Sequence, residues 1–133
     1  MPNSTRLRVL LVGQCNGASA ALGSWLRERR QLGVTGPTAT TAEALGLAAK
    51  QRPHVVLLDF HGLPVSTPYI VTLLKELSPA PQVFVLNHDA SAAMRRRCHA
   101  AHVDAVIDKT SELDLLATLL AGARESVTAN PLL

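Results

Sequence analysis

The stretch Val55-Val56-Leu57-Leu58-Asp59 decides the fold, because an unbroken aliphatic run ends there on a carboxylate. An apolar run of this length is typical of a strand buried on both faces, as in a parallel sheet covered by helices. Similar runs occupy residues 7–12, 83–86 and 105–107, and a weaker one occupies residues 34–39. The sequence therefore predicts five strands, each separated from the next by a longer connection.

Segments with helical spacing of apolar residues connect these strands. We predict helices at about residues 18–30, 40–51, 66–77, 91–101 and 111–125, and Thr40 and Glu43 form a capping-box pattern at the second one. Strands that alternate with helices predict an α/β fold, the flavodoxin-like doubly wound (βα)5 arrangement with a five-stranded parallel sheet in the order 2-1-3-4-5. Pro37 cannot donate a ladder hydrogen bond, which places residues 34–39 at the edge of the sheet.

Composition indicates a single folded domain. The chain has 133 residues, of which 47% are hydrophobic and 17% charged, and this excludes a disordered chain. A net charge of +3 is too small to indicate nucleic-acid binding without a clustered patch. No apolar run approaches the roughly 20 residues that span a bilayer, and the polar start has no signal-peptide core. We expect a cytoplasmic domain at residues 6–126, followed by a flexible tail or truncated linker at 127–133.

Polar residues follow several of the predicted strands. In doubly wound sheets, ligands bind at the carboxyl ends of the strands, near the switch point between strands one and three. We therefore expect the functional residues to gather at this edge. The candidates are Gly13, Gln14, Cys15, Asp59, His61, Asn87, His88 and Lys109.

Three pieces of sequence point to one family: the run ending at Asp59, the Leu63-Pro64 pair after it, and Val106-Ile107-Asp108-Lys109 near the end. Together they resemble the receiver domain of bacterial two-component response regulators, over about residues 6–124. The resemblance implies that Asp59 accepts a phosphoryl group and that Lys109 and Asn87 pair with the phosphate. It also implies a phosphorelay signalling role with Mg²⁺ as cofactor, a sensor histidine kinase or other signalling protein as partner, and no enzyme activity on an external substrate.

The predicted pocket departs from the family pattern. The family carries two acidic residues at the end of the first strand, where this sequence has Gly13-Gln14. Asp59 and Lys109 then cancel in charge, and Mg²⁺, which needs carboxylate ligands, should bind poorly. We expect a degenerate pocket that acts through protein–protein interaction or dimerisation. Its other unusual positions are Asn87 for Thr or Ser, His88 and Cys15 lining the pocket, His61 beside the metal site, and Val106 in place of an aromatic switch residue.

Two alternatives remain open at this point. Asp59, His61, His88 and Cys15 together could form a small-ligand or metal-binding module on the same scaffold. Arg95-Arg96-Arg97 could be a solvated helix face, a dimer face together with the last helix, or a DNA contact. The threonine at position 110, directly after Lys109, resembles receivers that are joined to a C-terminal DNA-binding domain. Binding to DNA would then be the role of such a domain, outside these residues.

Overall fold

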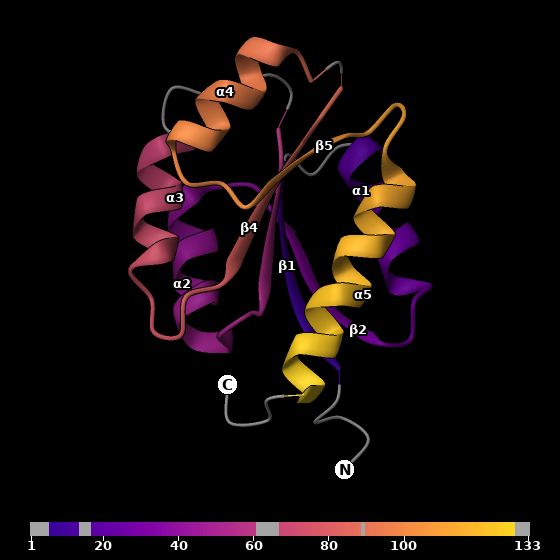
Figure 1. The fold of residues 1–133 in the computed structure, drawn as a ribbon. Helices are drawn as coiled ribbons and strands as arrows, with labels where there is room; N and C mark the ends of the chain where they lie inside the picture. Colours follow the sequence, from indigo (N-terminus) through magenta and orange to yellow (C-terminus); the bar gives the residue numbers. More distant parts are fainter. Residues whose placement is uncertain (1–5, 14–16, 61–66, 89, 130–133) are drawn as a thin grey trace.

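Five parallel strands alternate with five helices in a computed structural model, which describes residues 6–13, 17–60, 67–88 and 90–129 (Figure 1). The sheet order β2-β1-β3-β4-β5 confirms the doubly wound α/β prediction, with the Pro37 strand at an edge. The strands are β1 (Leu7–Gly13), β2 (Leu32–Thr38), β3 (Val55–Asp59), β4 (Gln82–Asn87) and β5 (Ala105–Asp108). The helices are α1 (Gly17–Arg27), α2 (Thr41–Gln51), α3 (Thr67–Lys75), α4 (Ala92–Ala100) and α5 (Leu113–Ala129).

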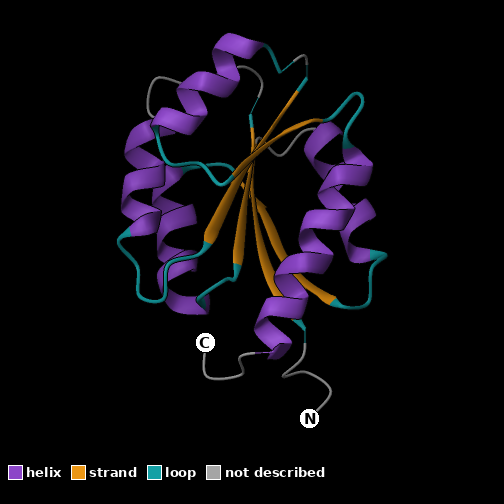
Figure 2. Cartoon of the chain, in the orientation of Figure 1, coloured by secondary structure: helices purple, strands orange, loops and turns teal. Residues whose placement is uncertain are grey.

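Helices cover both faces of the sheet (Figure 2), which separates two hydrophobic layers. Successive strand residues point to opposite faces, so Leu57 packs in the layer of α1 and α5, while Leu58 packs in the layer of α2, α3 and α4. Every residue of β3 is buried, which explains why its sequence is a continuous apolar run. Leu116 and Leu120 of α5 are buried in the first layer, and Trp25 of α1 packs at its border.

Two helices, α1 and α5, end three or more residues from the predicted position. Helix α1 ends at Arg27 instead of residue 30, because a turn brings Leu32 into register with Leu7 at the start of the sheet. Helix α5 continues to Ala129, since Ala123 and Val127 still pack against the core. Residues 127–129, predicted to belong to the tail, are therefore helical, and residues 130–133 lie outside the described part.

Side chains cap two of the helices, and one of these caps was predicted. The side chain of Thr40 accepts a hydrogen bond from the Glu43 amide at 3.1 Å, so the capping pattern is formed at α2. Ser91 caps α4 in the same way through the Met94 amide. Among the described residues, no helix is long and apolar enough to cross a membrane.

Strand β2 lies very close to β1 around Gly36. Gly36 has a φ of 104°, and a Cβ there would lie 2.3 Å from the carbonyl oxygen of Leu11. The register between the two strands shifts between Leu10 and Val12, beside this contact. Only glycine fits this backbone conformation without strain, so Gly36 fixes how the edge strand meets the sheet.

Candidate functional site

Asp59 ends β3, at the carboxyl edge of the sheet, and its carboxylate is almost fully buried. Its side chain is 2% exposed, and Oδ1 lies 2.6 Å from Nζ of Lys109, whose side chain is 12% exposed. Lys109 follows β5, and its amide donates to the carbonyl of Asn87, which holds the start of the β5–α5 connection against β4. The two residues are fifty positions apart and form a largely buried ion pair, at the edge of the sheet where the candidate residues were expected to gather.

The second carboxylate oxygen of Asp59 has a partner of its own. Oγ of Ser19, in the first turns of α1, donates to Oδ2 at 2.9 Å, and Ser19 is 3% exposed. Ser19 lies on the same helix face as Leu22 and Leu26, which pack into the core. Asp59 is therefore held from both sides, by an ammonium group and by a hydroxyl group.

Gly13 ends β1 directly beside this pair. It is in register with Asp59, and a Cβ at position 13 would lie 2.8 Å from Ser19 Oγ and 3.0 Å from the carbonyl oxygen of Asp59. Contacts below 3.0 Å force a neighbour to move. Ser19 thus reaches Asp59 through the space that a side chain at position 13 would need.

Asn87 ends β4 and is 4% exposed. Its Nδ2 donates to the carbonyl of Phe60 at 2.9 Å, which ties the segment after Asp59 to the neighbouring strand. A phosphate-pairing role for Asn87 stays a prediction. The side chain has a clear structural role at the rim of the pocket.

The other predicted site residues are less closely joined to Asp59. His88 is exposed, and its Nδ1 lies 3.3 Å from Oγ1 of Thr110. Val106 is partly buried on the α4 side of β5. Gln14, Cys15 and His61 lie outside the described residues. Within the described part, no three His, Cys, Asp or Glu side chains are grouped closely enough to hold a metal ion.

Solved structures of similar shape identify the fold. No protein-family model and no curated protein matches the sequence. The signal receiver domain of a protein described as a LuxO repressor, from Vibrio parahaemolyticus, superposes with a TM-score of 0.76 over 96% of both chains at 16% identity. The chain has the receiver-domain fold.

Two further structures extend the range of proteins with this receiver fold. A protein described as pilus assembly-related, from Burkholderia pseudomallei, gives a TM-score of 0.77 over 92% of both chains at 17% identity. The receiver domain of the response regulator Ssk1 from Saccharomyces cerevisiae, crystallised with the histidine phosphotransfer protein Ypd1, gives 0.70 at 18% identity, over 86% of both chains. These identities establish the shared fold.

The described residues of this receiver fold do not fit Mg²⁺. The ion requires several oxygen ligands at about 2.0–2.1 Å, usually including carboxylates. Asp59 is the carboxylate of the pocket, and both of its oxygens already bind Lys109 and Ser19. Gly13, where the resemblance implies an acidic ligand, offers no side chain and no room for one while Ser19 stays in place.

A second polar network joins the two loops beside the Asp59 pocket, and we call it the α4–β5 brace, formed by Arg95, Asp108 and Glu112. Arg95 of α4 donates through Nη2 to Glu112 Oε1 at 2.7 Å and through Nη1 to the carbonyl of Val106 at 3.2 Å. The amide of Asp108 donates to the same Glu112 oxygen at 2.9 Å.

Hydrogen bonds favour the charged forms of both carboxylates in the brace. The hydrogen bond from Arg95 lowers the pKa of Glu112, helped by the Asp108 amide. The Asp108 carboxylate accepts from the Thr110 amide, and this bond lowers its pKa; it also accepts from the Ala90 amide. The brace therefore connects the β4–α4 loop, α4, β5 and the β5–α5 loop.

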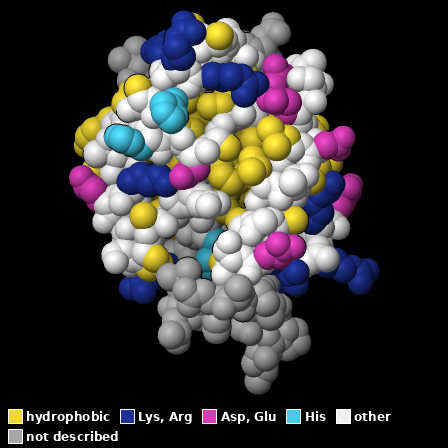
Figure 3. Space-filling view, in the orientation of Figure 1, with side chains coloured by type: hydrophobic (Ala, Val, Ile, Leu, Met, Phe, Trp, Pro, Cys, Tyr) yellow, Lys and Arg dark blue, Asp and Glu magenta, His cyan; other side chains and the backbone are white. Residues whose placement is uncertain are grey.

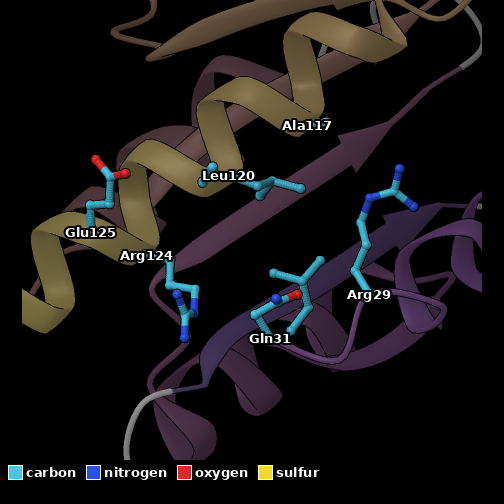
Figure 4. Close-up of a pocket in the computed structure, with 8 residues that line it drawn as sticks. Arg29, Gln31, Ala117, Leu120, Arg124 and Glu125 are labelled. Atoms are coloured by element: carbon cyan, nitrogen blue, oxygen red, sulfur yellow. The ribbon is translucent and has the colours of Figure 1, made fainter.

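A hollow of about 270 Å³ lies away from this chemistry, between α5 and the turn that precedes β2. Figure 4 shows Leu120 of α5 and Arg29 beside it. The guanidinium of Arg29 stacks on the Trp25 ring, 3.5 Å from its centroid. None of the residues lining the hollow belongs to the Asp59 pocket.

Sequence reasoning missed Ser19 and the brace. A signal for Ser19 was present, because it is a polar residue at positions i, i+3 and i+7 with Leu22 and Leu26 on an apolar helix face. Arg95 and Glu112 are seventeen residues apart and meet only through the packing of α4 on β5, so their spacing carries no signal. Cys98 of α4 is buried, and burial raises the pKa of its thiol.

Proposed function

We propose that this chain is a receiver-type module of two-component signalling that works through protein–protein contact, with Asp59 in the phosphoacceptor position of a degenerate pocket. The fold supports the signalling class, since receiver domains share it. The observation that carries the proposal is the 2.6 Å pair between Asp59 and Lys109, whose charges cancel without a metal ion. The proposed role is that of a signalling module and not of an enzyme acting on an external substrate.

The proposed contact face is formed by α4, β5 and α5. Lys and Arg side chains gather at the α4 end of this face, and hydrophobic side chains are visible between α4 and α5 (Figure 3). Leu115 of α5 is 40% exposed, and Met94 and Val106 are only partly buried. We propose this face for a partner signalling protein, such as a sensor histidine kinase, or for a second copy of the chain.

The test of the pocket is intact-protein mass spectrometry after incubation with acetyl phosphate, with and without Mg²⁺. In a competent receiver, an Asp59 oxygen would attack phosphorus, the bond to acetate would break, and acetate would leave with its electron pair. We expect no stoichiometric adduct in either condition. An Mg²⁺-dependent adduct that is lost in Asp59→Asn and kept in Asp114→Ala, an exposed carboxylate on α5, would contradict the degenerate pocket.

The test of the contact face is sedimentation velocity over a range of protein concentrations, with Leu115→Glu beside the parent chain. Self-association that this substitution abolishes would support a homodimer through α5. A monomer at every concentration would rule out the second copy and leave a different signalling protein as the partner. The control is Thr72→Glu, which places the same charge at an exposed position on α3, away from this face.

A further inference from the structure

Ser19 occupies a decisive position in the Asp59 pocket. It is buried, it comes from α1 and not from a strand end, and it donates to the oxygen of Asp59 that Lys109 does not bind. The receiver resemblance assigns no role to this position.

The Ser19 hydroxyl supplies a hydrogen bond that the buried Asp59 carboxylate requires. A buried carboxylate is costly unless its charge is paired and its oxygens accept hydrogen bonds. Lys109 balances the charge at Oδ1, and Ser19 supplies the donor at Oδ2. The carboxylate is thereby satisfied by side chains of the protein itself.

The hydroxyl also uses the space beside residue 13. An ideal Cβ at Gly13 has Ser19 Oγ as its nearest contact, at 2.8 Å, followed by Asp59 backbone oxygen at 3.0 Å and Asp59 Cβ at 3.3 Å. The last two contacts need shifts of only a few tenths of an ångström, whereas the first needs Ser19 to move. A carboxylate at position 13 and the Ser19–Asp59 hydrogen bond are therefore in steric competition.

We infer that Ser19 is a positioning residue that closes the pocket to divalent cations. Its hydroxyl binds Oδ2 of Asp59, and it occupies the space that an acidic side chain at position 13 would need. The inference builds on the placement of Asp59 in the proposed function, but it concerns the cation and not the partner. It also identifies which two positions must change together for the pocket to accept a cation.

The test is a double-mutant cycle with Gly13→Asp, Ser19→Ala and the double variant, each titrated with Mn²⁺ and followed by electron paramagnetic resonance. Interacting positions give a non-additive cycle. We expect weak binding in the parent chain and in each single variant. The double variant should bind at least about tenfold more tightly than the single effects combined, since two carboxylates then face the ion. Equal affinity in Gly13→Asp alone and in the double variant would overturn the inference.

A second readout covers the event that the Gly13→Asp variants do not fold. In Ser19→Ala, the ¹³C resonance of the Asp59 carboxyl carbon should shift, because Oδ2 loses its donor, while Ser24→Ala, an exposed position on α1, should leave it unchanged. An unchanged Asp59 resonance in Ser19→Ala would also overturn the inference. The outcome is separable from that of the proposed function: a phosphorylated parent chain refutes the degenerate pocket, whereas an additive cycle refutes only the role of Ser19.

Discussion

Nζ of Lys109 and Oδ1 of Asp59 lie 2.6 Å apart, although fifty residues separate them in the chain. The contact exists because β3 and β5 end at the same edge of the sheet with β4 between them. Both side chains are largely buried, so neither charge can be solvated alone. This ion pair therefore contributes to the stability of the fold and also lies at the centre of the candidate site.

Removing the lysine should be strongly destabilising. Lys109→Ala leaves the Asp59 carboxylate buried without its cation, and we expect a loss of about 3–5 kcal/mol in the free energy of unfolding. Urea denaturation followed by circular dichroism measures it. Lys50→Ala, an exposed lysine on α2, is the matched control and should change stability by less than about 0.5 kcal/mol. A loss below about 1 kcal/mol in Lys109→Ala would show that the pair is solvated in solution.

Two glycine-to-alanine substitutions should have opposite effects on stability. At Gly36, the φ of 104° and the approach of Leu11 O to 2.3 Å of a new Cβ should cost at least about 1–3 kcal/mol. Gly46 lies within α2 with nothing near a new Cβ, so alanine there should stabilise by about 0.5–1 kcal/mol. Thermal unfolding of both variants gives the comparison. Destabilisation at both positions to the same extent would contradict the close approach of β2 to β1.

The α4–β5 brace should protect the amide of Asp108 from hydrogen exchange. Glu112→Ala removes the acceptor of that amide and the partner of Arg95, so exchange at Asp108 should accelerate while the β3 amides keep their protection. The Arg95 and Glu112 side chains are partly exposed, so their coupling energy should be only about 0.2–1 kcal/mol. Glu125→Ala, exposed on α5, is the control and should leave the Asp108 amide unaffected.

Acid should weaken the same brace. The folded-state pKa of Glu112 lies below its ordinary value of 4.5, mainly because of the hydrogen bond from Arg95. Its contribution to stability is therefore fully present above about pH 4.5 and is lost as the pH falls through the folded-state value. Arg95→Ala should make unfolding less sensitive to pH in that range. An unchanged acid dependence in Arg95→Ala would disprove the coupling.

His54 should make the protein less stable in mildly acidic solution. Burial lowers its pKa from the ordinary 6.5, and the charge of Arg8 lowers it further. Nδ1 accepts from the Arg8 amide at 2.9 Å, and His54, Arg8 and Arg52 line a second hollow, separate from the one beside Leu120. The unfolded chain thus binds this proton more readily, and stability falls as the pH drops through about 6.5. His54→Asn, whose side-chain oxygen can replace Nδ1, should flatten the profile between about pH 7 and 5. His99→Asn, exposed on α4, should not.

The fold was predictable because its signals are local. The run at Val55–Asp59 and the capping pattern at Thr40 each act within a few residues, and Pro37 indicated an edge strand. The strand order followed from the alternation of strands and helices along the chain. The roles of Asp59 and Lys109 were implied by the receiver resemblance, and the two side chains meet because Asp59 ends β3 and Lys109 follows β5 at the same edge of the sheet. Helix ends were predicted less accurately, since α1 and α5 end where long-range packing on the sheet decides.

The neighbours of the pair were harder to predict. The contact between Ser19 and Asp59 depends on how deeply α1 sits against the end of β1, which the apolar pattern of α1 does not measure. The contact between Arg95 and Glu112 depends on the tilt of α4 over β5. Both contacts join a helix side chain to a residue in a loop or at a strand end. Whether such side chains meet depends on the packing distance, which residue spacing in the sequence does not predict.

The brace has a consequence for how information can pass through this domain. Arg95 of α4 donates to the carbonyl of Val106, and the Asp108 carboxylate accepts from the amide of Ala90. The β4–α4 loop and the β5–α5 loop are therefore joined by the same hydrogen-bond network. A ligand of α4 that displaces the brace would change the energy of the pocket, and a change in the pocket would then alter the affinity of α4 for that ligand by the same factor. Such coupling would act in both directions, from the pocket to the α4 surface and from the α4 surface to the pocket.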